Sequence, residues 1–229
     1  MQLHGLIPAV LVLLALSCGR ETGKVPAPEA PEAAAPVQDE VREGAVTAYY
    51  DNGTVREKYT LSDGKLQGQY LRYRPSGDLE SSSFYKDNLL DGTLTRFYES
   101  GNRVRSTQSY KAGRRNGPLI IYYRDGSIRS SFGYNNDHLD GDLIVYYPSG
   151  QVCQTMTMSG SSLNGTITFY YENGQISETY MARNGKIEGE YLSYYANGSL
   201  RRKGQYKNGQ MYGTWHDFTP EGQESVYKY

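Results

Sequence analysis

The feature that most constrains this chain is a glycine that recurs at a fixed interval. Eight such glycines each begin a copy of one sequence pattern, and they are separated by 24, 24, 25, 24, 24, 24 and 24 residues. They are Gly44, Gly68, Gly92, Gly117, Gly141, Gly165, Gly189 and Gly213. A strict period of roughly 20 to 50 residues is typical of repeat arrays, in which each unit packs against its neighbours.

Each copy contains a first turn signal, located by counting from its leading glycine as position 0. Position +5 is aromatic and position +9 is glycine in all eight copies, and position +7 is proline in three of them, at Pro75, Pro148 and Pro220. A type I′ hairpin turn requires positive φ at both central residues, which proline cannot adopt. The pattern therefore predicts a three-residue loop, formed by a type I turn followed by a left-handed glycine.

A second cluster of turn-forming residues lies late in each of the first seven copies. The clusters are Asp63-Gly64, Asp87-Asn88, Ala112-Gly113, Asn136-Asp137, Ser159-Gly160, Asn184-Gly185 and Asn208-Gly209. Two turns in every 24 residues leave no room for a helix over residues 44–229, and no stretch there has helical periodicity. The chain is therefore predicted to be all-β, an elongated single-layer antiparallel meander of about eight hairpin repeats and about 16 strands, which must twist.

The residues before the array have a different composition. An apolar run, Leu6 to Leu16, is too short to span a bilayer and reads as the hydrophobic part of a secretory signal. It ends at Ala15-Leu16-Ser17-Cys18, which resembles the processing site of bacterial lipoproteins. We predict a signal peptide at 1–17 and a lipid on Cys18, with an unmodified Cys18 after an ordinary signal as the alternative. By resemblance, Gly19 after the cysteine implies an outer-membrane location.

A linker of alanine, proline and glutamate follows, and we assign residues 18–43 to it. Such a composition cannot bury enough apolar surface to fold. Proline-rich chains extend by about 3.1 Å per residue, so it could hold the array up to roughly 80 Å from a membrane. A short recognition motif is the alternative. If Cys18 carries a lipid, Cys153 is the only remaining thiol, so no internal disulfide can form, and we expect Cys153 to be a small buried hydrophobic residue.

The stretch Gly204–Trp215 resembles the MORN (membrane occupation and recognition nexus) repeat. It has a tyrosine, then Asn-Gly, three further residues, a glycine and an aromatic strand. Bacterial variants of this repeat fit best and cover 44–229, and some of these relatives are labelled as antitoxins. The resemblance implies an interaction scaffold that contacts protein or lipid, and it brings no catalytic residue.

Residues for catalysis or metal binding are not apparent. His138 and His216 lie in different repeats without a cysteine or carboxylate at ligand spacing, His4 lies in the signal, and no serine stands in a nucleophile-elbow motif. The net charge of −1 provides no general attraction for nucleic acid. We therefore predict no enzyme activity, no cofactor, no metal and no nucleic-acid partner.

Two sets of side chains are candidates for binding. The first is a tyrosine ladder at position +6: Tyr50, Tyr98, Tyr123, Tyr147, Tyr171 and Tyr195. The second is a basic patch in repeat three: Arg103, Arg105, Lys111, Arg114 and Arg115. The ladder either covers the sheet or forms a stacking platform for sugars or partner side chains. The patch is either a solvated strand face or a contact for anionic lipid head groups or lipopolysaccharide.

These observations favour a lipid-anchored scaffold of the bacterial cell envelope that binds a protein partner through the repeat sheet. The alternative is a binder of cell-wall glycan or peptidoglycan that uses the tyrosine ladder.

Overall fold

The structure, a computed structural model, describes residues 43–229. All regular structure in this range is β-strand. The strands are β1 (Gly44–Tyr49), β2 (Val55–Ser62), β3 (Lys65–Tyr73), β4 (Leu79–Lys86), β5 (Leu89–Leu90), β6 (Gly92–Phe97), β7 (Val104–Lys111), β8 (Arg114–Tyr122), β9 (Ile128–Asn135), β10 (His138–Tyr146), β11 (Val152–Ser159), β12 (Ser162–Leu163), β13 (Gly165–Tyr170), β14 (Ile176–Arg183), β15 (Lys186–Tyr194), β16 (Leu200–Lys207), β17 (Gln210–Phe218) and β18 (Glu224–Lys228).

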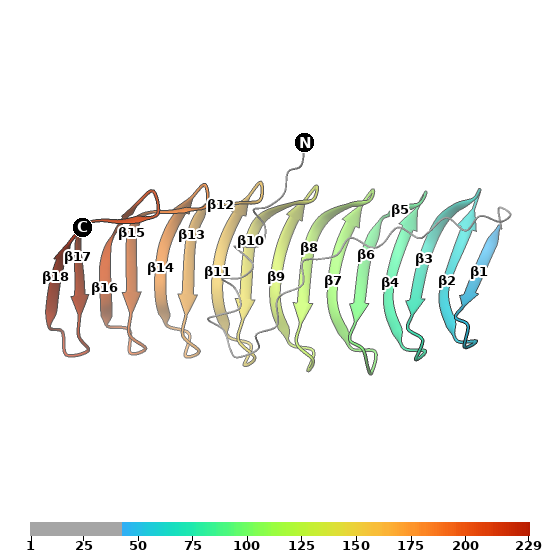
Figure 1. The fold of residues 1–229 in the computed structure, drawn as a ribbon, viewed down its shortest axis with the longest axis horizontal. Helices are drawn as coiled ribbons and strands as arrows, with labels where there is room; N and C mark the ends of the chain where they lie inside the picture. The colour runs from blue at the N-terminus through green and yellow to red at the C-terminus, as the bar shows by residue number, and fades with distance from the viewer. Residues whose placement is uncertain (1–42) are drawn as a thin grey trace.

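Apart from the two-residue strands β5 and β12, each strand pairs antiparallel with the long strands before and after it in the chain, so the sheet is a continuous meander (Figure 1). The short strand β5 pairs only with β4, and β12 pairs only with β11. β5 and β6 together occupy one row of the sheet, as do β12 and β13, so the 18 strands fill 16 rows. The predicted all-β single-layer meander of hairpin repeats is confirmed.

The first turn of each repeat has the predicted three-residue form in seven copies. In repeat one, the Gly53 amide donates to the Tyr50 carbonyl over 2.9 Å, and the Tyr50 amide donates to the Thr54 carbonyl over 2.8 Å. Gly53 has φ of 82°, whereas the two loop residues before it stay out of the positive-φ region. This is the type I turn with a left-handed glycine that the proline positions required.

Repeat three departs from this form because the one 25-residue spacing places an extra residue in its first turn. The Tyr98 amide donates to the Arg103 carbonyl over 2.8 Å, which encloses a loop longer by one residue than in the other copies. Asn102 takes up this residue in the left-handed region, at φ of 49°. Asparagine tolerates that region better than most residues with a side chain.

The second turn of each repeat is a two-residue hairpin with positive φ at both central residues, as in type I′ turns. Asp63 and Gly64 have φ of 50° and 69°, and the corresponding pair is left-handed in each of the seven copies that contain this turn. In repeat five this pair is Gly160 and Ser161, at 55° and 66°. The predicted turn at Ser159-Gly160 was therefore wrong by one residue, because Ser159 is the last residue of β11.

The two faces of the sheet differ in burial. Positions +2 and +4 point to one face, together with their partners on the following strand, and we call it the inner face. Its core includes Leu119, Phe132, Leu143, Met156 and Ile167, all of them at most 5% exposed. Because successive side chains alternate between faces, positions +3 and +5 lie on the opposite, outer face.

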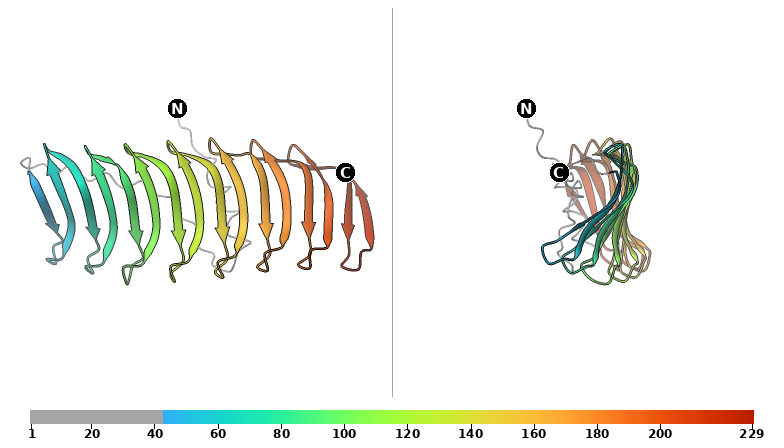
Figure 2. Two further views of the ribbon diagram at one scale, coloured as in Figure 1. Left: turned by 180° about the vertical axis from the view of Figure 1, so that it is seen from behind. Right: turned by 90° about the vertical axis from the view of Figure 1, so that its right-hand side faces the viewer.

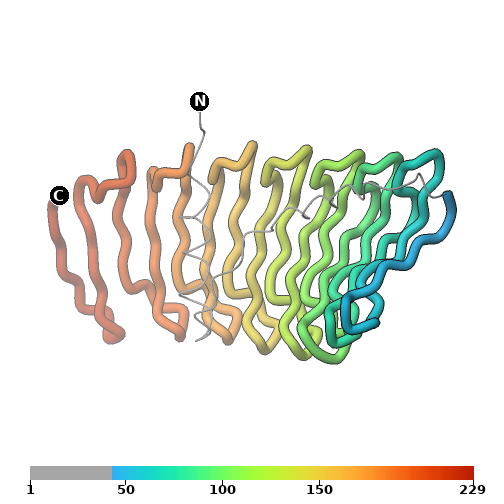
Figure 3. Tube along the Cα trace, turned by 45° about the vertical axis from the view of Figure 1, so that its right-hand side comes forward, coloured from blue at the N-terminus to red at the C-terminus, as the bar shows by residue number. Residues whose placement is uncertain are grey.

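The ribbon is elongated and its strands are bowed (Figures 1 and 2). The trace in Figure 3 shows that the rows also rotate along the length of the ribbon, as the twist of β-strands requires. A flat single layer leaves its side chains open to solvent. We infer from the burial of the inner face that the strands bow around it.

Candidate functional site

The tyrosine side chains of the ladder are hydrogen-bonded to the backbone of the sheet. Each of its six hydroxyls donates a hydrogen bond to the backbone carbonyl at position +5 of the next repeat, at 2.6 to 3.0 Å. The acceptors of Tyr50, Tyr98, Tyr123, Tyr147, Tyr171 and Tyr195 are the carbonyls of Tyr73, Tyr122, Tyr146, Tyr170, Tyr194 and Phe218. These bonds connect neighbouring hairpins at the end where the three-residue turns lie.

Repeat two has an arginine at this position, and the arginine makes the same connection. Arg74 Nη2 donates to the Phe97 carbonyl over 2.9 Å, which is position +5 of repeat three. Its Nη1 also donates to the carbonyls of Leu79 and Tyr98, over 3.0 and 3.3 Å. A side chain of different chemistry that reaches the same acceptor indicates that position +6 serves the joint between repeats.

In the structure the ladder joins neighbouring repeats of the same chain. The sequence analysis considered it as a cover for the sheet or as a binding surface, and did not predict these hydrogen bonds. The six rings are half-buried, and Tyr147 packs against the inner core. Arginine in place of tyrosine at position +6 was the one signal in the sequence for this role. It becomes readable only when the arginine and tyrosine hydrogen bonds are compared.

The outer face carries an apolar stripe that the sequence analysis did not single out. The aromatic residue at +5 pairs directly with the apolar residue at +11, as in Tyr122 with Ile128 and Tyr170 with Ile176. Tyr49, Ile128 and Ile176 are 58%, 39% and 40% exposed. This outer stripe contains one residue from each of 14 of the 18 strands: Tyr49, Val55, Tyr73, Leu79, Phe97, Val104, Tyr122, Ile128, Tyr146, Val152, Tyr170, Ile176, Tyr194 and Leu200.

The inner face is aromatic near both ends of the ribbon and aliphatic between them. Toward the C-terminal end, Tyr180 stacks on Tyr191 with centroids 6.0 Å apart, and Tyr191 contacts Trp215 at 5.4 Å. The Trp215 ring is 1% exposed. Tyr59 and Tyr70 stack in the same manner near the N-terminal end, at 5.4 Å.

Two ionisable pairs lie in this inner aromatic region. Burial raises the pKa of the Glu178 carboxyl above its ordinary value, and a hydrogen bond from Tyr191 opposes part of that shift. The Arg202 guanidinium donates through Nη2 to Asp217 Oδ2 over 2.6 Å, and this contact holds the pKa of Asp217 below its ordinary value. Both carboxyl groups are hydrogen-bonded to other side chains of the sheet, Glu178 to Tyr191 and Asp217 to Arg202. We therefore assign them to the packing of this face.

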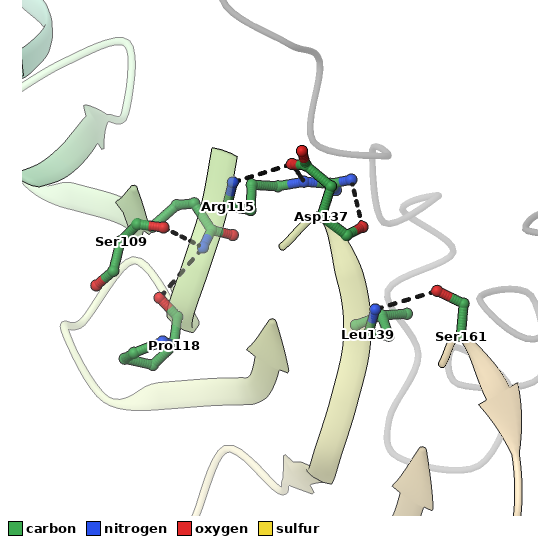
Figure 4. A network of polar contacts seen from close by, with 7 residues as sticks. Ser109, Arg115, Pro118, Asp137, Leu139 and Ser161 are labelled. Atoms are coloured by element: carbon green, nitrogen blue, oxygen red, sulfur yellow. Dashed lines mark hydrogen bonds and ion pairs between the residues drawn. The ribbon is translucent and has the colours of Figure 1, made fainter. Parts of the chain in front are cut away.

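At the opposite ends of the strands, where the two-residue turns lie, other hydrogen bonds join neighbouring repeats. The Arg115 amide donates to Asp137 Oδ1 over 2.9 Å, and the Asp137 amide returns a bond to the Arg115 carbonyl over 3.0 Å. Leu139 and Ser161 repeat this exchange one repeat later, with the Leu139 amide donating to Ser161 Oγ over 3.1 Å (Figure 4). Hydrogen bonds therefore connect each of these repeats to the next at both ends of the strands.

The predicted basic patch does not form one surface. Arg103 comes directly before β7 and Arg105 is its second residue, both beside the first turn of repeat three, whereas Lys111 and Arg114 flank the two-residue turn at the other end of β7. At about 3.3 Å per residue the two ends are about 25 Å apart. Arg115 forms a salt bridge with Asp137 at 3.1 Å and lies over the Tyr134 ring at 4.4 Å.

Cys153 is buried as expected, at 1% exposure. It is however disulfide-bonded in this structure, which differs from the expectation that no internal disulfide forms. The sequence contains one other cysteine, Cys18, which falls in residues 1–42, outside the described part. A lipid thioether on Cys18 and a disulfide between the two cysteines exclude each other, so a free-thiol assay and the mass of the mature N-terminal peptide distinguish them.

The signal at 1–17 and the linker at 18–43, apart from Glu43, also fall outside the described residues.

No group of three or more histidine, cysteine, aspartate or glutamate side chains within residues 43–229 is arranged to hold a metal ion. The same range includes no helix with the length and hydropathy needed to cross a bilayer.

Comparison with solved structures gives weak likenesses. A GtfA/B complex bound to UDP and GlcNAc shares 11% identity, with a TM-score of 0.23, over 49% of this chain and 22% of that chain. A TcdB2-TccC3-Cdc42 structure shares 10% identity, with a TM-score of 0.17, over 80% of this chain and 14% of that chain. The chain thus spans less than a quarter of either protein, and at these scores neither likeness supports an argument about fold or function.

Comparison with sequences gives one family. No curated protein matches the chain. Repeats of the matching family generally mediate protein or membrane binding and are typically non-catalytic. The family model described as MORN repeat variant matches four segments of this chain, residues 42–63, 139–159, 163–184 and 187–208.

Proposed function

We propose that this protein is a lipid-anchored interaction scaffold of the bacterial cell envelope, that it has no catalytic activity, and that it binds a protein partner through its repeat sheet. The observation that carries the proposal is the outer stripe. It is an apolar row on a sheet face that no second layer covers within residues 43–229, and it includes Tyr49, Ile128 and Ile176 at 39% exposure or more. Contiguous exposed apolar surface is typical of interaction sites.

The joints between repeats support a scaffold. Hydrogen bonds from position +6 at one edge, and from the two-residue turns at the other, hold neighbouring hairpins in a fixed lateral relation. A partner that contacts several repeats then meets a surface organised before binding. Such pre-organisation reduces the entropic cost of association.

Site-specific photocrosslinking in intact cells tests the protein-binding proposal. A photoreactive benzoylphenylalanine replaces Ile176 or Ile128 in the outer stripe, and Lys186 at the far end of β15 as the matched exposed control. We expect an adduct with one protein from the two stripe positions and none from Lys186. Equal labelling from all three positions, or no protein adduct from any of them, would contradict the proposal.

The anchor has a separate test. Cys18→Ser should move the protein from the membrane fraction to the soluble envelope fraction if Cys18 carries the lipid. Separation of inner and outer membranes then examines the outer-membrane location. Unchanged membrane association of Cys18→Ser would contradict the anchor and would leave the crosslinking result to stand by itself.

A second candidate function, binding to cell-wall glycan or peptidoglycan, is favoured by the aromatic residues at position +5. These rings lie on the outer face and recur every second strand, or about every 10 Å. Aromatic faces are suited to stacking on sugar rings. Co-sedimentation with peptidoglycan sacculi, before and after muramidase digestion, distinguishes this function: pelleting that digestion abolishes would favour the glycan.

A further inference from the structure

The break in period at repeat three creates a cleft between two neighbouring turns. The cleft has a volume of about 670 Å³ and is lined by Arg103, Val104, Thr107, Tyr122, Asp125 and Gly126. A smaller hollow of about 320 Å³ adjoins it, and Arg103 lines both. Both hollows lie at the turn that contains the extra residue Asn102.

The hydrogen bonds between turns show why the gap opens at this place. In repeats one and six, a short asparagine at +8 reaches the carbonyl at +7 of the next turn, from Asn52 to Pro75 over 3.2 Å and from Asn173 to Ala196 over 2.8 Å. In repeat three, the carbonyl at the same place, that of Arg124, is reached by Arg103 Nη1 over 2.9 Å. A long arginine spans what an asparagine spans elsewhere, which is consistent with a wider separation of the two turns.

Arg103 and Arg124 both line the smaller hollow at this gap. The Arg124 side chain extends back over the Tyr98 ring, with Cζ 4.9 Å from the ring centroid. Within residues 43–229, neither Arg103 nor Arg124 forms a salt bridge. Because a guanidinium has five N–H donors in a fixed fork, each group retains donors for a carboxylate after these contacts.

The nearby carboxylate of Asp125 is occupied locally. Its Oδ1 accepts bonds from the Ser127 amide and hydroxyl, over 2.8 and 2.6 Å. The two adjoining hollows together therefore contain two positive groups, Arg103 and Arg124, one committed carboxylate, and apolar surface from Val104 and Tyr122 of the outer stripe. That combination complements a ligand with an acidic group beside an apolar one.

We propose that the Arg103–Arg124 cleft binds an acidic side chain of the partner protein, with the apolar residue next to it in the partner placed on Val104 and Tyr122. The proposal rests on the proposed function as a protein-binding scaffold and locates the point at which the partner is aligned along the array. Both guanidiniums would hydrogen-bond the partner's carboxylate, and bidentate contacts of this kind are among the stronger charged hydrogen bonds.

The test is an NMR titration of the full chain with a short blocked peptide that contains one aspartate followed by one phenylalanine. We expect saturable shifts at the amides of Gly101, Arg103 and Gly126, and at least tenfold weaker binding of the same peptide with asparagine in place of aspartate. Arg103→Gln and Arg124→Gln should each weaken binding at least tenfold, whereas Arg201→Gln, an exposed arginine on β16, should leave it unchanged.

Deletion of Asn102 provides an independent arm, because it restores the 24-residue spacing. It should close the cleft and abolish the shifts, with the distant Trp215 signal retained as evidence of folding. Equal binding of the aspartate and asparagine peptides would overturn the proposal, as would tighter binding of N-acetylmuramate than of the peptide. If crosslinking from Ile176 still captures a partner in Arg103→Gln, the scaffold function stands and the cleft assignment fails. If the peptide binds as expected but no partner is crosslinked, the ligand preference of the cleft stands and the scaffold function fails.

Discussion

Removing one hydroxyl from the tyrosine ladder should measurably weaken the array. Tyr171→Phe deletes the 2.7 Å hydrogen bond to the Tyr194 carbonyl and leaves the ring in place. A net contribution of about 0.5–1.5 kcal/mol is typical of such a bond. For a domain of this size, about 1 kcal/mol corresponds to a fall in Tm of about 2–4 °C.

The matched control is the preceding residue. The Tyr170 hydroxyl makes no hydrogen bond to another residue in the described range, so Tyr170→Phe removes the same atom without removing a joint. Urea unfolding followed by far-UV circular dichroism should give a lower midpoint for Tyr171→Phe than for Tyr170→Phe. Indistinguishable midpoints would refute the assignment of the ladder to the joints between repeats.

The loss of stability becomes larger when all six tyrosines of the ladder are replaced. Neighbouring sites are at least about 10 Å apart along the sheet, so their effects should approximately add. The loss of about 6 kcal/mol is comparable with the total stability of many domains, which is about 5–15 kcal/mol. The sixfold Tyr→Phe variant should therefore unfold partly at room temperature. In contrast, Arg74→Tyr should keep the array folded, because tyrosine makes this connection in the other copies.

Two further predictions concern the inner face. Gly204→Ala would place a Cβ 2.2 Å from the Trp215 ring, so it should cost about 1–3 kcal/mol and shift Trp215 fluorescence to the red; an unchanged spectrum and urea midpoint would contradict this. Because burial raises the folded-state pKa of Glu178, ionising this group opposes folding, and its contribution to stability should fall as pH rises through that pKa. Glu178→Gln should remove that part of the pH dependence in urea titrations from pH 4 to 8, while a slope identical to that of the unchanged protein would refute it.

The regular features of the fold could be predicted because they are local. Proline at +7 and glycine at +9 fix the backbone of the first turn within three residues. The turn at Gly160-Ser161 was misplaced because Ser159-Gly160 and Gly160-Ser161 have similar turn chemistry when read locally. Counting from Gly141, as in the other copies, would have placed it correctly.

The contacts between repeats could not be predicted in the same way. The bond from Tyr171 to the Tyr194 carbonyl joins residues 23 apart in the sequence, and it depends on how neighbouring turns are offset laterally. The basic patch illustrates the opposite error. Arg103 and Lys111 are close in the sequence, but an extended strand places them at opposite edges of the ribbon.

An array of similar joints also limits how its function can be encoded. If every repeat presented the same surface, a partner could bind in any of several registers, separated by one repeat, with nearly equal affinity. Preference for one register requires a feature that occurs in one repeat, because specificity is a difference between affinities. The additional residue Asn102 provides such a feature, since it turns one joint into a cleft with Arg103 and Arg124 at its edge. The effect of deleting Asn102 on crosslinking is therefore informative beyond affinity: with the spacing restored, a partner that had been held at one place should be captured from several stripe positions along the sheet.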